Sequence, residues 1–222
     1  MQTWVVSQLA SGERVISERL DHVRSVAVGF WIGAGSRDET AARSGVSHFI
    51  EHLLFKGSSS YTALEIAELF DEMGGELNAA TSREHTVVYA RVPDVHLERA
   101  LDVMSDMVCS PLFDDLDAER EVVLEEIAMY EDTPQELVHD LIAEAVFGSH
   151  ALVLMFVGSP DVTKSHCTSS ELLHDAEAAF VEPLRRLPHS FTVYAPPAQA
   201  PMMAEICGTT PDASVLRRKM SA

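Results

Sequence analysis

Five consecutive residues place the strongest constraint on this chain: His48, Phe49, Ile50, Glu51 and His52. On an α-helix, residues four apart lie on one face, so the two imidazoles can bind one metal ion. Neutral imidazoles suit zinc, and a catalytic zinc site takes three protein ligands and keeps a fourth position for water. Glu51 lies beside the histidines, where a carboxylate can remove a proton from that water. The string is typical of metal-dependent hydrolases, although two histidines on a helix surface beside a charge also fit it.

An acidic segment further along the chain supplies candidates for the third ligand. Glu119 and Glu126 are seven residues apart on a predicted helix, so they share a face, with Val122 and Val123 between them on nearly the same side. Glu125 points about 100° away from Glu126. If the apolar side chains pack against the histidine helix, Glu126 is buried near the metal and Glu119 lies two turns away. A solvated helix face is the alternative for any one of these carboxylates.

Strand and helix signals alternate along the chain. The stretch 3–33 is rich in β-branched and aromatic residues, which indicates a strand meander, and 77–92 predicts a return to strand. The spacing of apolar residues predicts helices over about 44–54, 63–73, 95–108 and 116–131. This alternation predicts an α+β fold, in which helices pack on one face of a largely antiparallel sheet.

Three helix ends carry explicit signals. Thr62 and Glu65 form a capping box ahead of an apolar run, and the Gly74–Gly75 pair ends the same helix. Thr133, followed by Pro134 in the first helical position, opens a further helix as its cap. These signals define helix boundaries that periodicity alone leaves open.

The pattern weakens after about residue 151. Residues 171–180 predict a helix and 191–194 a strand, whereas 196–222 show no period. We therefore expect one zinc-binding domain over residues 1–195 and an irregular tail, compatible with disorder, over 196–222.

Charge and cysteine usage exclude several classes of partner and site. The formal net charge of -19, from 35 acidic and 16 basic residues, argues against nucleic acid and suits a cationic peptide. The three cysteines are widely spaced and outside any Cys-x-x-Cys pattern, so neither a disulfide framework nor a cysteine zinc site is expected. Neither a signal peptide nor a membrane span is predicted, so we expect a cytoplasmic protein.

Several motifs in one order resemble the inverted-zincin peptidases, the family of pitrilysin, insulin-degrading enzyme and the mitochondrial processing peptidase. The motifs are His48–Gly57 (HFIEHLLFKG), Gly74–Ala79 (GGELNA), Thr81–Thr86 (TSREHT) and Glu119–Glu126 (EREVVLEE). The resemblance runs from about residue 2 to about residue 149. It corresponds to the N-terminal, zinc-binding domain of that family.

The resemblance implies a role for each matched site residue. His48 and His52 match the family's metal ligands, Glu126 matches the third ligand, and Glu51 matches the base. Glu119 matches a second acidic residue that the family places near the metal, and we include it among the expected catalytic residues. Zinc is the implied cofactor.

The same resemblance points to a substrate-binding strand. Asn78 and Ala79 match an edge strand with which an extended peptide substrate pairs through main-chain hydrogen bonds. His85 lies in a predicted strand nearby and does not match a family ligand. Phe49 and Phe55 are expected in the core rather than against substrate.

The chain departs from the family after the last matched helix. Members have two similar domains in one chain, or two partner chains, and this sequence shows one such domain. A Leu-Gly-Arg-Pro-like turn is replaced by residues 151–155, of sequence ALVLM. The leading hypothesis is therefore a zinc-dependent endopeptidase of extended or unfolded peptides that needs a second domain, a partner subunit or a homo-oligomer. The alternatives are a non-catalytic scaffold or peptide-holding subunit of the same fold, and a zinc hydrolase of small molecules, which would need a closed apolar pocket.

Overall fold

The structure is a computed structural model that describes residues 4–9, 13–113, 115–153, 157–166 and 190–195. The helix predicted over 171–180 and the tail predicted over 196–222 lie outside these residues. The division into a domain over 1–195 and a tail therefore stays a prediction.

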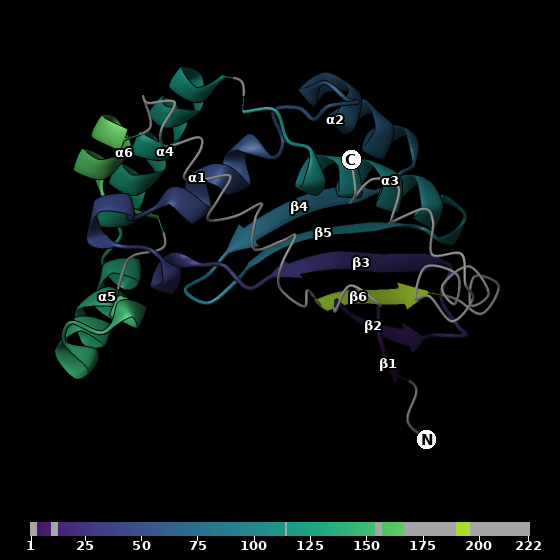
Figure 1. Cartoon of the computed structure of the whole chain (residues 1–222), viewed down its shortest axis with the longest axis horizontal. Helices are drawn as coiled ribbons and strands as arrows, with labels where there is room; N and C mark the ends of the chain where they lie inside the picture. Colours follow the sequence, from purple (N-terminus) through teal and green to yellow (C-terminus); the bar gives the residue numbers. More distant parts are fainter. Residues whose placement is uncertain (1–3, 10–12, 114, 154–156, 167–189, 196–222) are drawn as a thin grey trace.

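A six-stranded sheet with the order β1-β2-β6-β3-β5-β4 forms the base of the domain (Figure 1). Its strands are β1 Trp4–Gln8, β2 Arg14–Arg19, β3 Ser25–Ile32, β4 Glu76–Thr81, β5 Thr86–Pro93 and β6 Ser190–Ala195. Every pair is antiparallel except β2 with β6, which is parallel. The fold is thus α+β with a largely antiparallel sheet, as the sequence predicts.

The predicted meander is wrong at one place. β2 and β3 are not neighbours, because β6 lies between them and pairs with both. The strand predicted over 191–194 is confirmed, but its own residues do not indicate which strands it joins. Strand pairing between segments far apart in sequence depends on tertiary packing rather than on local pattern.

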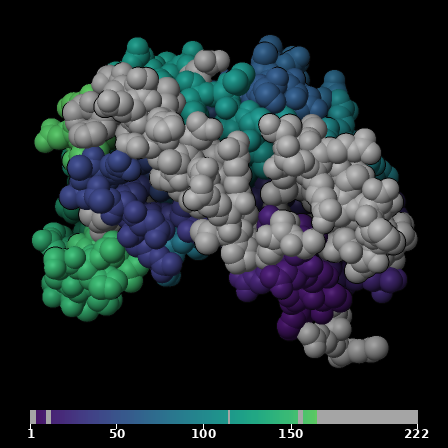
Figure 2. All heavy atoms as spheres, in the orientation of Figure 1, coloured from purple at the N-terminus to yellow at the C-terminus, as the bar shows by residue number. Residues whose placement is uncertain are grey.

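Helices cover one face of the sheet and gather at one of its ends (Figure 1). The α-helices are α1 Val46–Leu53, α2 Ala63–Glu72, α3 Leu97–Cys109, α4 Leu116–Glu131, α5 Pro134–Phe147 and α6 Pro160–His166. The short 3-10 turns are η1 Ser36–Asp38, η2 Ala41–Arg43, η3 Asp94–His96 and η4 Ala151–Val153. Helix α5 projects from the rest of the domain, at the lower left of Figure 1 and Figure 2. None of the helices in the described ranges is both long and apolar enough to cross a membrane.

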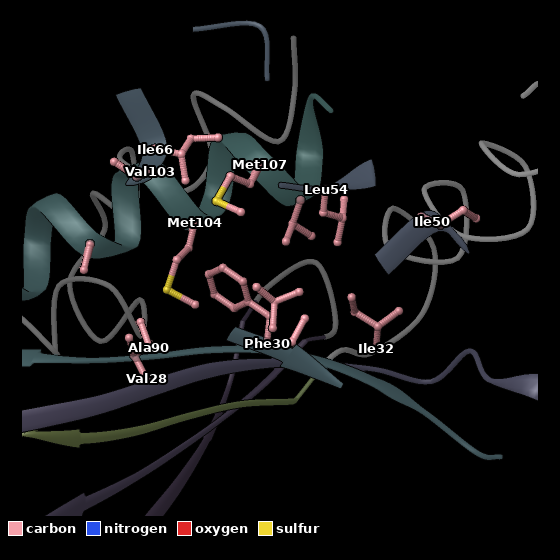
Figure 3. Close-up of a cluster of buried hydrophobic side chains, with 14 of the residues drawn as sticks. Val28, Phe30, Ile32, Ile50, Leu54, Ile66, Ala90, Val103, Met104 and Met107 are labelled. Atoms are coloured by element: carbon pink, nitrogen blue, oxygen red, sulfur yellow. The ribbon is translucent and has the colours of Figure 1, made fainter. Parts of the chain in front are cut away.

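The core lies between the sheet and the helices. Val28, Phe30 and Ile32 of β3 are buried at every second position and point toward helical side chains such as Met104 and Met107 (Figure 3). The opposite face is more open: Ala27 of β3 and Tyr89 of β5 are exposed and Trp31 is partly exposed, whereas Gly29 is buried. This alternation is typical of an antiparallel sheet with one solvated face.

Local signals set the ends of α2 as the sequence predicts. The Thr62 hydroxyl accepts a hydrogen bond from the Glu65 backbone, and Glu65 accepts one from the Thr62 backbone at 2.8 Å. At the other end Gly74 adopts a φ of 64°, and the Gly75 N–H bonds to the Phe70 carbonyl. The left-handed Gly74 and the hydrogen bond of Gly75 together form a Schellman ending. Glycine adopts this left-handed conformation without strain.

Helix α5 begins at the predicted place but without the predicted cap bond. Thr133 is its N-cap residue and Pro134 its first position. The Thr133 hydroxyl donates to the Met129 carbonyl at 2.8 Å instead of accepting from α5. The short link between α4 and α5 brings that carbonyl within reach, so the hydroxyl caps the preceding helix.

Candidate metal centre

Helix α1 carries the His-x-x-Glu-His string with its apolar side toward the core. Phe49, Ile50 and Leu53 are almost fully buried, so Phe49 lies in the core as predicted. This anchoring leaves His48 and His52 on the side of α1 that packs against α4. The sequence folds this way because the apolar and the chemically active residues occupy different faces of one short helix.

Three nitrogen and oxygen atoms form a nearly equilateral triangle between α1 and α4. The Nε2 atoms of His48 and His52 are 3.3 Å apart. Glu126 Oε2 lies 3.4 Å from His48 Nε2 and 3.3 Å from His52 Nε2. Among the described residues, these three form the group of histidine, cysteine or acidic side chains that is able to hold a metal ion.

The triangle has the dimensions of a zinc site. At zinc–ligand bond lengths of about 2.0–2.1 Å and the tetrahedral angle, ligand atoms lie about 3.3 Å from each other. The three separations match this value without movement of the backbone. Two imidazoles and one carboxylate are also a ligand set that zinc accepts in catalytic sites. The residues therefore fit a zinc ion with one position left for water.

His48 lies in an environment that favours its neutral form. Its pKa is lowered to about 4, and the largest cause is the desolvation of its buried side chain. The nearby His52 contributes to this lowering of the pKa, and a hydrogen bond with the Val157 backbone opposes it. A neutral imidazole is the form that binds a metal, so the burial of His48 prepares it for that role at neutral pH.

His52 is held by a different contact. Its Nδ1 lies 3.4 Å from Oε2 of Glu119, whose Oε1 is 2.6 Å from Lys56 Nζ. Glu119 is buried, whereas about a third of the Lys56 side chain is exposed. A carboxylate behind a metal-binding histidine fixes the tautomer and orientation of its ring. Glu119 thus contacts the proposed ligand His52 and is not itself one of the three residues of the triangle.

The packing of α4 differs from the expectation in two respects. Val123 is buried as predicted, but Val122 is exposed. Glu126 is not buried, since 43% of its side chain is exposed. Both differences have one cause: only the row that contains Glu119, Val123 and Ile127 packs inward, which leaves Glu126 at the rim of the site.

Glu51 lies between the two histidines in sequence, and strand β4 of the sheet holds its side chain in place. The Thr81 hydroxyl donates a 2.5 Å hydrogen bond to Glu51 Oε2, and the Thr81 backbone contributes another. Burial raises the pKa of Glu51, and the bonds from Thr81 oppose this shift. A carboxylate with a raised pKa suits a general base that must also return its proton near neutral pH.

Asn78 and Ala79 lie on β4, which is the last strand of the described sheet and pairs with β5 alone. Asn78 is exposed and Ala79 is buried. The Ala79 N–H donates to the Asn78 side-chain oxygen at 2.8 Å. β4 also carries Thr81, so the edge strand and the carboxylate of Glu51 are directly linked.

Sequence reasoning missed two residues of this site, Lys56 and Thr81. Lys56 lies three residues beyond the end of α1, and its ion pair with Glu119 joins it to another element. The partner of Thr81, Glu51, also belongs to another element, so no local spacing indicates either contact. His85 lies apart from the triangle and bonds through Nδ1 to the Ser82 hydroxyl at 3.1 Å.

Comparison with known proteins gives one consistent family. The sequence profile of the insulinase family, peptidase family M16, matches residues 14–158. The uncharacterized zinc protease YmxG of Bacillus subtilis is 47% identical over 169 residues, which are 74% of this chain and 41% of that protein. An uncharacterized zinc protease of Mycobacterium leprae is 48% identical over 153 residues, which are 68% of this chain and 34% of that protein. The chain therefore matches about a third to two fifths of the length of these relatives.

Solved structures share the fold at low sequence identity. A protease from Helicobacter pylori superposes with a TM-score of 0.82 at 20% identity, over 94% of this chain and 50% of its own. A peptidase M16 inactive domain from Pseudomonas fluorescens gives 0.80 at 17% identity, over 100% of this chain and 52% of its own. At such identities the likeness concerns the fold alone.

Proposed function

The chain belongs to the insulinase family of peptidases, peptidase family M16, and from this premise we propose that it is the zinc-binding half of an endopeptidase that hydrolyses extended or unfolded peptides. The observation that carries the proposal is the triangle of His48, His52 and Glu126, whose size matches a tetrahedral zinc site. Relatives at 46–48% identity are named zinc proteases.

Each residue of the site has a defined part in the proposed reaction. His48, His52 and Glu126 would hold zinc, which when bound supplies a Lewis acid that polarises a peptide carbonyl and acidifies a water molecule. Glu51 accepts the proton of the attacking water and delivers it to the leaving amine. The Thr81 hydroxyl holds Oε2 of Glu51 and so fixes the place of the carboxylate. Glu119 keeps the His52 ring oriented.

The edge strand β4 gives this half a means of binding peptide. An extended peptide that pairs with the free edge of β4 gains main-chain hydrogen bonds that do not depend on its sequence. Thr81 at the end of β4 contacts Glu51, so a peptide on that edge lies beside the base. The Ala79 N–H must leave Asn78 before it can bond to such a peptide.

A second domain or subunit completes the proposed enzyme. This half supplies a zinc site and an edge strand, while hydrolysis also needs donors for the developing oxyanion and a wall that excludes water. Large apolar residues at helical spacing lie exposed along α5: Val138, Leu141, Ile142, Val146 and Phe147. Neighbouring apolar side chains that are exposed together suit a protein–protein contact. The additional length of the relatives is a natural source of the second half.

A non-catalytic scaffold is the rival function, favoured by the similarity to an M16 domain described as inactive. The complete set of Glu51 and the three triangle residues favours catalysis, because a scaffold has no physical need for it. A closed apolar pocket for a small molecule is disfavoured by Glu126, which stands at the rim with its side chain half-exposed.

Zinc analysis followed by digestion of a peptide mixture tests the proposal. We expect about one zinc per chain, and cleavage that a chelator abolishes and zinc restores. Glu51→Gln should retain the zinc and lose at least about 10²-fold in rate, because the amide cannot accept the proton of water. Size-exclusion chromatography should place the activity in assembled fractions, with a strictly monomeric fraction at least about 10²-fold slower.

Two results would count against these assignments. Loss of zinc in Glu51→Gln would make Glu51 a ligand instead of the base. A wild-type chain that binds zinc, yet cleaves nothing in any assembled fraction, would favour the scaffold.

A further inference from the structure

The first turn of α1 is held by a side chain from outside the helix. Glu39 lies six residues before the N-cap residue Gly45. Its Oε2 accepts a 2.7 Å hydrogen bond from the Gly45 N–H, and its Oε1 accepts one of 2.7 Å from the Ser47 N–H. The Ser47 hydroxyl adds a further bond. Both oxygens of one carboxylate are therefore bound within the three residues that precede His48.

The residue at the start of α1 has no means of capping the helix itself. Gly45 has a φ of 92°, and a Cβ atom at this position would lie 2.6 Å from the Gly158 Cα. A Cβ at Gly158 would likewise lie 2.7 Å from the Gly45 Cα. The two backbones pack so closely that the serine, threonine or aspartate usual at an N-cap does not fit. A capping oxygen must come from elsewhere, and Glu39 provides it.

The backbone contact and the carboxylate act on the same ligand. Val157, directly before Gly158, forms the backbone hydrogen bond with His48. His48 is the third residue of α1 and lies in the first turn, where a helix without a cap frays. His52 is one turn further along and has its own partner in Glu119. The position of His48 depends more on the helix start than that of His52 does.

We propose that Glu39 is a positioning residue of the metal centre: it fixes the first turn of α1 and thereby the place of the His48 imidazole in the ligand triangle. The proposal rests on the zinc site of the proposed function. It predicts that zinc affinity depends on a carboxylate that touches neither the metal nor its ligands. Outer-shell groups that orient a ligand change metal affinity by about 10–100-fold when they are removed.

Helix α2 offers a matched control. Thr62 caps α2 through its own side chain, is exposed, and belongs to a helix without any proposed site residue. Thr62→Ala therefore removes a helix cap of the ordinary kind. Glu39→Ala removes a cap from the helix that carries the metal ligands. Glu39→Gln keeps the shape and one acceptor oxygen and should lie between Glu39→Ala and the wild type.

The test measures zinc affinity by competition with a chelator, together with the visible spectrum of the cobalt(II)-loaded chain and the melting temperature of the metal-free chain. We expect Glu39→Ala to lose about 10–100-fold in zinc affinity and to change the cobalt spectrum, with partial recovery in Glu39→Gln. Thr62→Ala should lower the melting temperature and leave affinity and spectrum unchanged.

Wild-type affinity and spectrum in Glu39→Ala would overturn the proposal, as would an equal loss of affinity in Thr62→Ala. If Glu39→Ala does not fold, Glu39→Gln decides, and wild-type values in that variant overturn the proposal as well. Failure of the wild-type chain to bind zinc is a different result, because it would remove the proposed function itself.

Discussion

The two ends of α1 hold their histidines by different kinds of contact. His48, at the start, is buried and surrounded by backbone groups and by the first turn that Glu39 caps. His52, at the end, faces the charged pair of Glu119 and Lys56. One ligand is therefore prepared by burial and the other by charge. A four-residue spacing makes two histidines converge, but it does not make their surroundings alike.

Glu126 contacts both histidines, so its removal should have the largest effect on metal binding. Its Oε2 lies at nearly equal distances from both Nε2 atoms. We expect Glu126→Ala to lose more affinity for zinc than the roughly 10–100-fold typical of outer-shell changes, because it removes one of three ligands. Metal content after dialysis against a weak chelator measures the loss.

Glu125→Ala is the control for this variant. Glu125 is exposed and points to another side of α4 than Glu126. The zinc content of the Glu125→Ala variant should therefore equal that of the wild type. Equal loss in both variants would mean that the face of α4 is assigned wrongly.

Glu119 tests the His52 end alone, with a smaller expected effect. Glu119→Ala should lower zinc affinity by about 10–100-fold, because the His52 ring loses the carboxylate that orients it. Glu121→Ala, an exposed acidic residue on the same helix, removes the same formal charge and should change little. Chelator competition compares the two variants, and wild-type affinity in Glu119→Ala would show that His52 needs no such partner.

Much of the fold follows from local sequence. The capping box of Thr62 and Glu65 and the Gly74–Gly75 pair set the ends of α2 because each signal acts within a few residues. The place of β6 between β2 and β3 did not follow, since it depends on pairing with strands far away in sequence. Hydrophobic periodicity predicts which face of an element is buried, but it does not predict which other element packs against that face.

The same distinction applies to the site, where some features follow from local sequence and others depend on tertiary packing. The convergence of His48 and His52 follows from helical spacing, and the choice of Glu126 came from resemblance to a family. The exposure of Val122 and the contact of Glu119 with His52 depend on how α4 is rotated against α1, which the spacing leaves open. The hydrogen bonds between Thr81 and Glu51 and between Glu39 and α1 join separate elements, so no local sequence pattern predicts them.

The smallest predicted effect concerns the His48 end and appears in the metal-free chain as a dependence of stability on pH. The pKa of His48 is about 4 in the folded chain, whereas an unperturbed histidine, as in the unfolded chain, has a pKa of 6.5. Between these values the unfolded chain binds a proton that the folded chain does not. Stability is therefore complete above the unfolded pKa and falls as the pH falls toward the folded one. From about pH 7 to about pH 5.5 the loss from this group is about 1 kcal/mol.

Denaturant unfolding with a chelator present, at both pH values, measures this loss. Burial raises the pKa values of Glu39 and Glu51, so these groups contribute with the opposite sign, and stability rises where the folded chain keeps their protons. The quantity of interest is thus the difference between the wild type and His48→Gln, in which the histidine contribution is absent. The wild type should lose about 1 kcal/mol more than His48→Gln over this range. An equal dependence in both proteins would mean that burial does not hold His48 neutral, and the contrast between the two ends of α1 would then reduce to the charged pair beside His52.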